Sequence, residues 1–166
     1  MIMEDVIKIA SYICQRYEYE LGAQIEEMKL HKLLYFCQRE SFIQLGEPMF
    51  AEKFRARLYG PVMLEVHAKF ISGELVEKLS EEALKKYRVV LDRVFAVYAI
   101  KNVASLVAIS KGQYSYVKVT KSFGWMQPRD VEMQTEDIRI DAERFRMRHF
   151  MLSQLEEVRN HQHSMV

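Results

Sequence analysis

The side chains best suited to metal binding are dispersed along this chain of 166 residues. The five histidines stand at positions 31, 67, 149, 161 and 163, and the two cysteines, Cys14 and Cys37, lie 23 positions apart. None of these spacings is typical of a metal site. His161 and His163 are near enough to chelate an ion, but a frayed tail lacks the surrounding groups that orient metal ligands. We therefore predict no metal and no cofactor.

The motifs of the common enzyme classes are missing as well. The six glycines form neither a P-loop nor a G-x-G-x-x-G fingerprint, and no H-E-x-x-H, C-x-x-C or G-x-S-x-G occurs. The adjacent acids Glu26 and Glu27 would point in different directions on a helix, and so would Glu156 and Glu157. The sequence therefore favours a protein that is not an enzyme. An enzyme whose pocket holds acids with strongly shifted pKa values is the alternative left open.

Charge is distributed unevenly along the chain. Residues 1–83 carry 10 Lys and Arg against 14 Asp and Glu, whereas residues 84–166 carry 14 against 9. Within the second half, residues 84–129 hold nine basic side chains and one acid, Asp92, a net charge of +8. Such a segment is suited to steering an acidic protein or a nucleic acid. The simpler interpretation is that it balances the acidic first half within one molecule.

The cellular compartment is predicted from three features. Both cysteines fall in apolar helical patterns, so a reducing environment is expected. Glu4 and Asp5 stand where a secretory signal would be basic. The most apolar stretch, residues 94–109, is shorter than a membrane span and contains Lys101. We predict a cytoplasmic protein with no membrane segment.

Apolar periodicity predicts a mostly α-helical fold with a small antiparallel β element, in a single compact domain over residues 1–160 followed by a disordered tail, 161–166. Helical spacing occurs in residues 5–17, 28–45, 61–70, 80–98, 103–110 and 142–160. Ser80 and Asp141 are expected to cap helices, and Gly46 to end one. Alternation over residues 50–58 predicts a strand. Residues 114–120 (YSYVKVT) are β-prone by composition. Phe145, Leu152 and Leu155 are the inward-facing candidates of the last helix.

Two blocks of the sequence have a more specific pattern of residue types than a helix or a strand alone would need. The first runs from Lys29 to Gln38 (KLHKLLYFCQ) and is followed by GEPMF at residues 46–50. The second runs from Phe54 to Val62 (FRARLYGPV). Together they resemble the Panacea domain, the SocA-like antitoxin family often described as phage-associated, whose patterns are K-L-x-K-L-L-Y-x-x-Q, G-x-P-x-F and F-x-A-W-x-Y-G-P-V. The spacing between the blocks also matches.

The chain departs from that family at several positions. Arg57 stands where the family has Trp, and His67 where it has an aromatic residue. The family's T-H-x-E-x-P-W stretch aligns with residues 110–116, where its His, Glu, Pro and Trp are replaced. The replacing residues are Lys111, Gln113, Ser115 and Tyr116. Any activity that relies on that His and Glu is therefore not carried over. The family pattern implies a helix over residues 111–120, whereas composition predicts a strand.

The resemblance implies a protein-binding role. Such antitoxins neutralise a cognate toxin, and one branch is a proteolytic adaptor that delivers its toxin to a cytoplasmic AAA+ protease. The candidate partner-binding residues are Arg55, Arg57, Tyr59, Tyr35, Gln38, His67, Lys111 and Tyr116. The motif positions expected to serve the fold are Lys29, Leu33, Leu34, Gly60 and Pro61. For Tyr35, Gln38 and Tyr59, fastening the strand to the second helix is the competing role. A nucleic-acid-binding regulator that uses residues 84–129 is the alternative function.

Overall fold

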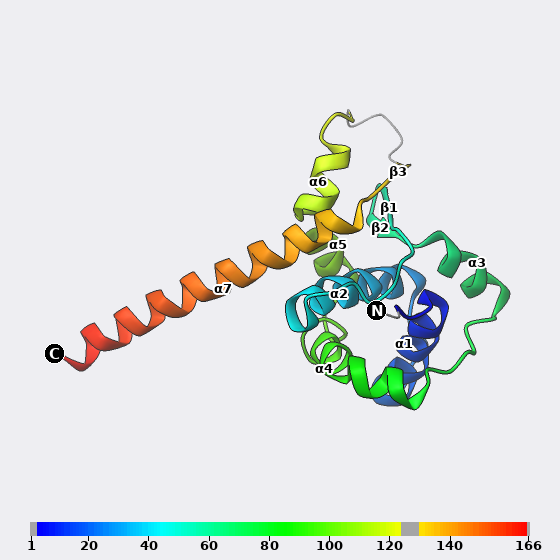
Figure 1. Cartoon of the computed structure of the whole chain (residues 1–166), viewed down its shortest axis with the longest axis horizontal. Helices are drawn as coiled ribbons and strands as arrows, with labels where there is room; N and C mark the ends of the chain where they lie inside the picture. Colours follow the sequence, from blue (N-terminus) through cyan, green and yellow to red (C-terminus); the bar gives the residue numbers. More distant parts are fainter. Residues whose placement is uncertain (1–2, 124–129, 166) are drawn as a thin grey trace.

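The computed structural model describes residues 3–123 and 130–165. Within them lie seven helices and three short strands in one compact domain, from which the last helix projects (Figure 1). The helices are α1 (Val6–Leu21), α2 (Glu27–Leu45), α3 (Leu64–Ser72), α4 (Glu81–Val97), α5 (Val103–Lys111), α6 (Tyr114–Thr120) and α7 (Thr135–Ser164). The strands are β1 (Arg55–Arg57), β2 (Gly60–Val62) and β3 (Asp130–Glu132). The predicted fold class is confirmed.

Helix α2 forms the centre of the core. It packs against α1, α4, α5 and the first turns of α7, and Figure 1 shows it enclosed by its neighbours. Every residue from Lys29 to Phe42 is buried, the charged side chains of Lys32, Arg39 and Glu40 included. Because buried charges are costly unless they find polar partners, these side chains mark where the tertiary structure must supply such partners.

Local signals end and begin the helices largely as predicted. The Ser80 side chain accepts a hydrogen bond from the Ala83 backbone N–H at 3.1 Å and caps α4. Asp5 caps α1 in the same way through the Ile7 N–H. Gly46 adopts a left-handed conformation, φ 71°, directly after α2, which its lack of a Cβ permits.

The strands form an antiparallel sheet with β1 in the middle, in the order β2-β1-β3. Ala56 of β1 is buried and lies opposite Pro61 on one side and Val131 on the other. Arg55 and Arg57 point to the more exposed face, as the alternating pattern predicts. The sheet therefore presents its arginines together, next to the tight turn that joins β1 to β2.

Residues 114–120 form helix α6, so the strand predicted from their composition is wrong and the helix implied by the family pattern is confirmed. Ser115, Tyr116 and Thr120 are buried, which is a helical spacing. The backbone N–H of Ser115 donates to Asp141 of α7 at 3.0 Å. Packing against α7 therefore overrides the β propensity of the segment.

Helix α7 also differs from its prediction. It begins at Thr135 rather than Ala142, and Asp141 is a buried residue inside the helix instead of its cap. The helix continues to Ser164, so residues 161–164 of the expected disordered tail are helical. Leu152 and Leu155 are exposed rather than inward-facing. Within the described residues, no helix combines the length and apolarity needed to cross a bilayer.

Candidate functional site

A pocket of about 540 Å³ opens between the start of α2, the β1–β2 turn and α3. Its volume falls within the usual range for small-ligand sites. The side chains lining it are Glu27, Met28, His31, Lys32, Arg57, Leu58, Tyr59, Val62 and His67. Both sequence blocks contribute, because residues 31–32 belong to the first and residues 57–62 to the second. The pocket is therefore the meeting point of the two most informative parts of the sequence.

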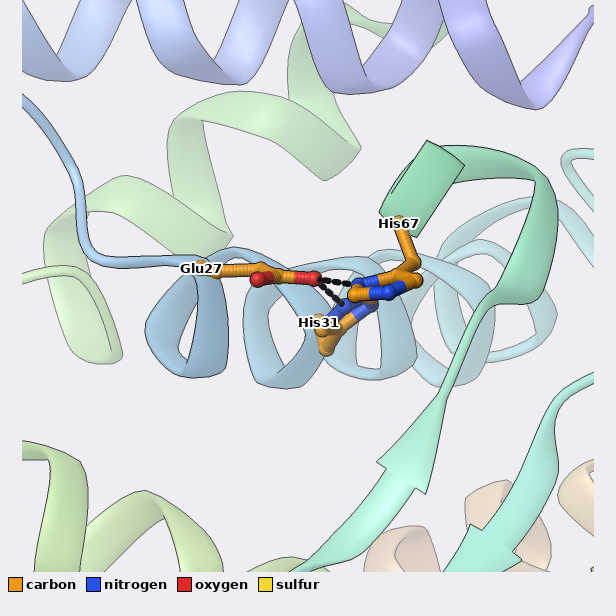
Figure 2. Close-up of side chains that lie close together, drawn as sticks. All are labelled: Glu27, His31 and His67. Atoms are coloured by element: carbon orange, nitrogen blue, oxygen red, sulfur yellow. Dashed lines mark hydrogen bonds and ion pairs between the residues drawn. The ribbon is translucent and has the colours of Figure 1, made fainter. Parts of the chain in front are cut away.

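Glu27 holds two histidines at one edge of this pocket (Figure 2). Its Oε1 lies 3.2 Å from Nε2 of His31, one turn along α2, and it also contacts Nδ1 of His67 on α3. The two imidazoles lower the pKa of the Glu27 carboxyl by hydrogen bonding, against the opposing effect of burial. One carboxylate oxygen therefore joins the first turn of α2 to α3.

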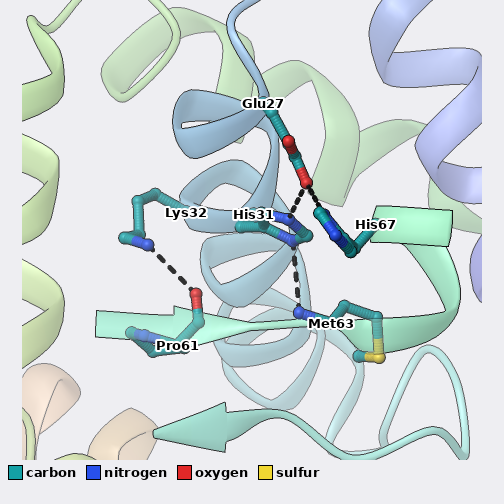
Figure 3. A network of polar contacts seen from close by, with 6 residues as sticks. All are labelled: Glu27, His31, Lys32, Pro61, Met63 and His67. Carbon is teal, nitrogen blue, oxygen red and sulfur yellow. Dashed lines mark hydrogen bonds and ion pairs between the residues drawn. The ribbon is translucent and has the colours of Figure 1, made fainter. Parts of the chain in front are cut away.

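The proton position on His31 follows from its second nitrogen. The backbone N–H of Met63 donates to Nδ1 of His31 at 3.1 Å, so Nδ1 carries a lone pair and Nε2 carries the proton (Figure 3). Burial lowers the pKa of His31 to about 4, which keeps the ring neutral at pH 7. His31 thus donates to Glu27 and accepts from Met63 at the same time.

This hydrogen-bond pattern is unsuited to a metal ion. The ligand atoms of Glu27, His31 and His67 lie within 4.8 Å of one another, a separation compatible with shared coordination. A metal on Nε2 of His31 would require the proton on Nδ1, where it would face the Met63 N–H. Metal-bound histidines instead donate their other N–H to an acceptor. The cluster therefore fastens α3 to the first turn of α2.

Lys32 lies in the wall of the pocket and is 1% exposed. Its Nζ donates to the Pro61 carbonyl at 3.1 Å, and burial lowers the pKa of this lysine to about 8 (Figure 3). Gly60, the first residue of β2, adopts φ 103°, and a Cβ there would lie 3.0 Å from Cε of Lys32. A buried ammonium group held by one carbonyl therefore fixes the β1–β2 turn against α2.

The family model described as "Antitoxin SocA-like, Panacea domain" matches residues 30–137, which is more than half of the chain. The chain belongs to the SocA-like Panacea family. No significant match was found among curated proteins or among solved structures. The matched region includes most of the pocket and ends just after the start of α7, so the projecting part of α7 lies outside it.

The structure brings three of the predicted partner-binding residues of this Panacea domain into the pocket, namely Arg57, Tyr59 and His67. Tyr59 is more than half exposed. Arg55 lies nearby on β1, with its Nε 2.6 Å from Oδ1 of Asp130. Lys111 stands apart, in the last turn of α5. The structure thus groups the residues of the hairpin and α3, and separates Lys111 from them.

Tyr35, Gln38 and Tyr116 occupy positions that a partner cannot reach in this structure. Tyr35 and Gln38 are fully buried, and Tyr116 is 3% exposed. The Tyr35 hydroxyl donates to Asp141, Gln38 binds the backbone of residues 49–50, and the Tyr116 hydroxyl donates to the Arg57 carbonyl at 2.7 Å. In the structure each of the three fastens one element of the Panacea domain to another, which for Tyr35 and Gln38 is in line with the competing role considered for them.

The motif positions expected to serve the fold are all buried, which agrees with a structural role. They are Lys29, Leu33, Leu34, Gly60 and Pro61. Lys29 donates through Nζ to the Ala99 carbonyl at 3.0 Å. The sequence patterns did not predict the Glu27–His31–His67 cluster or the burial of Lys32. The i, i+4 spacing of Glu27 and His31 is nevertheless a signal for their contact. His67 is 40 positions from Glu27, so only the folded chain brings these two together.

The basic segment 84–129 is partly neutralised by acids from elsewhere in the chain. Nζ of Lys86 lies 2.6 Å from Oε1 of Glu47, and Nζ of Lys118 lies 3.1 Å from Oδ1 of Asp137. Both acids lie outside the segment. This supports the interpretation that part of the positive charge balances acidic side chains within the molecule.

Proposed function

We propose that this chain is an antitoxin, a non-enzymatic binding module that neutralises a cognate toxin by direct contact in the cytoplasm. The family match over residues 30–137 supports an antitoxin-related role. The single structural observation that carries direct binding is the projecting part of α7, residues 146–164, which extends away from the domain (Figure 1). We define residues 146–164 as the α7 extension.

The α7 extension presents large apolar side chains to solvent. Met147, Met151, Leu155 and Val158 follow one another at steps of four, four and three residues, so they share one face of the helix. Each is between 56% and 66% exposed, and Phe150 flanks them. We call the five residues the α7 apolar face. An exposed apolar stripe of this kind is typical of an interaction surface.

Packing cannot explain why this part of the chain is helical. Every described residue from 146 to 165 is exposed, so no tertiary contact of the domain buries it. In proteins most helical stability comes from packing an apolar face against other parts of the structure. Covering a side chain such as Leu155 on a partner contributes roughly 1.5–3 kcal/mol. Binding of a toxin groove or helix to this face would provide that stabilisation.

A co-expression assay tests the proposal. The gene adjacent to this one is expressed alone and then together with the chain, and rescue of growth is expected together with co-purification. The double variant Met151→Glu, Leu155→Glu should lose both rescue and co-purification, because it places two charges on the apolar face. The matched control, Ser153→Glu with Asn160→Glu, adds the same charge on the other side of the helix and should retain both.

Two results would contradict the proposal: an adjacent gene that is harmless, or full rescue by the Met151→Glu, Leu155→Glu variant. The amount of toxin protein separates the two antitoxin modes. Direct neutralisation leaves the toxin present and bound. An adaptor instead lowers the toxin level, and only while a AAA+ protease is active.

A further inference from the structure

A second concavity, of about 340 Å³, lies where α2, α4, α5 and the base of the α7 extension meet. Four cationic side chains line it, contributed by Arg39, Arg93, Lys101 and Arg148, and none of its lining residues is acidic. We call this the cationic groove. Clefts lined by one sign of charge concentrate ligands of the opposite sign. The groove is distinct in position and chemistry from the pocket around Glu27.

Arg39 is the buried member of the groove, at 2% exposed. One terminal nitrogen donates to Oε1 of Gln113 at 3.2 Å, and the other to the Tyr98 hydroxyl at 2.5 Å. Its Nε–H has no hydrogen-bond partner, and no carboxylate among the described residues forms an ion pair with it. Buried arginines are almost always paired with an anion. Arg39 instead interacts with the buried carboxylate of Asp141 only at longer range, and its Nε–H remains an unused donor.

Aromatic rings surround the same guanidinium. Its Cζ lies 4.5 Å from the centre of the Phe145 ring and 5.0 Å from that of Phe36. The Phe36 and Tyr98 rings are stacked, 4.0 Å apart. These contacts hold the guanidinium in place without neutralising it. Arg39 is therefore positioned in advance for an incoming anion.

The other three cations are also uncompensated. Arg93, Lys101 and Arg148 form no ion pair with any residue that the structure describes. They reach the groove from α4, from the turn before α5 and from α7. Like charges gathered from three parts of the chain repel one another, and a multiply charged anion would relieve that repulsion.

We infer that the cationic groove binds a small anion that carries a diphosphate group, either inorganic pyrophosphate or the phosphates of a nucleotide. Guanidinium groups pair with phosphate oxygens through two parallel hydrogen bonds, and four cations match two or more negative charges. The volume suits a small molecule. His149 also lines the groove and is exposed, so it offers a ring on which a base can stack.

Binding is measured on the full chain by calorimetry and by the midpoint of thermal unfolding, at constant ionic strength. The probes are pyrophosphate, ATP, AMP and inorganic phosphate. Pyrophosphate and ATP are expected to bind and to raise the midpoint, with AMP and phosphate about tenfold weaker or more, because fewer charges reach the four cations. ATP binding more tightly than pyrophosphate identifies a nucleotide site, and equal binding identifies a diphosphate site.

The double variant Arg93→Gln, Arg148→Gln should weaken binding about tenfold or more, since it removes two exposed cations of the groove without touching buried Arg39. The control Lys85→Gln, Arg88→Gln removes the same charge from exposed positions of α4 outside the groove. It should bind as the unmodified chain does. The inference is overturned if neither pyrophosphate nor ATP binds, or if both double variants lose affinity equally. Because no toxin is present, the result is independent of the proposed antitoxin function.

Discussion

The hydroxyl of Tyr35 donates a hydrogen bond to Oδ2 of Asp141 at 2.7 Å, which joins the middle of α2 to α7 across 106 positions of sequence. The same carboxylate accepts from the backbone N–H of Ser115 at 3.0 Å and from its hydroxyl at 2.5 Å. All three residues are buried. Asp141 therefore holds α2, α6 and α7 together at the point from which α7 leaves the domain.

Removing the two ends of this contact should have unequal effects on stability. Tyr35→Phe deletes one of three donors to Asp141 and should lower the free energy of unfolding by about 1 kcal/mol. Asp141→Ala leaves the Tyr35 hydroxyl and the Ser115 N–H buried without an acceptor, and should cost about 3 kcal/mol. Urea denaturation of the two variants checks this order. A larger loss for Tyr35→Phe would contradict the role assigned to Asp141.

The buried ring of His31 predicts a loss of stability in mild acid. Burial lowers the pKa of His31 from 6.5 to about 4, so between these values the unfolded chain binds a proton that the folded chain does not. Stability is therefore complete above about pH 6.5 and falls by about 2 kcal/mol between pH 7 and pH 5. Measurements are kept above pH 5, because the lowered pKa of Glu27 becomes relevant only in stronger acid.

Comparison of two variants assigns this pH dependence to one ring. His31→Asn should show a flatter dependence of the unfolding free energy on pH, whatever its absolute stability. His67→Asn removes the other histidine of the cluster but keeps the buried ring of His31, so flattening found only in His31→Asn belongs to that ring. Identical slopes for the unmodified chain and His31→Asn would show that His31 is not the group that titrates.

Lys32 predicts a rise of stability with pH as well, but in the alkaline range. Burial lowers its pKa from 10.5 to about 8, so above pH 8 the folded chain releases a proton that the unfolded chain keeps. Keeping this buried ammonium charged costs the folded chain stability, and raising the pH from 7 to 10 removes that cost. The free energy of unfolding should therefore rise by about 2 kcal/mol from this group. Lys32→Met has no ammonium group, so it lacks this contribution at every pH. The stability of this variant relative to the unmodified chain should fall by that amount over the same interval.

The comparison with Lys32→Met cancels the titration of the cysteines. Burial raises the pKa of Cys14 to about 11 and raises that of Cys37 further, so their ionisation in the unfolded state lowers stability at high pH. Both thiols are present in both proteins. Guanidinium chloride denaturation at pH 7, 8, 9 and 10 provides the difference, and a constant difference would mean that Lys32 is not desolvated.

Gly60 should tolerate substitution less well than other glycines with positive φ. It has φ 103°, and a Cβ there would lie 2.8 Å from Oγ of Ser110 as well as close to Lys32. Gly60→Ala should therefore cost about 3 kcal/mol, from backbone strain and from displacement of its neighbours. Gly73 has φ 72° with open space around it, and Gly73→Ala should cost about 1 kcal/mol. Thermal or urea unfolding measures both losses. Equal losses of stability in the two variants would show that Gly60 is not tightly packed against Ser110 and Lys32.

Local signals in the sequence predicted most of the helices. The apolar spacing of α1, α2 and α4, the Ser80 cap and the Gly46 stop depend on residues within four positions of one another, and the structure reproduces them. Strand β3 was not predicted, because it is three residues long and pairs only with β1, 75 positions away. Its partner, rather than its own composition, makes it a strand.

The sequence by itself determined that this is a mostly helical domain of the SocA-like Panacea family, because apolar periodicity and the two motif blocks are properties of neighbouring residues. Only the tertiary structure decided that residues 114–120 are helical, that Asp141 is a buried acceptor and that Glu27 joins His31 to His67. The physical reason is that a polar side chain becomes buried only where a distant segment supplies its hydrogen-bond partner, and these partners lie 26, 106 and 40 positions away.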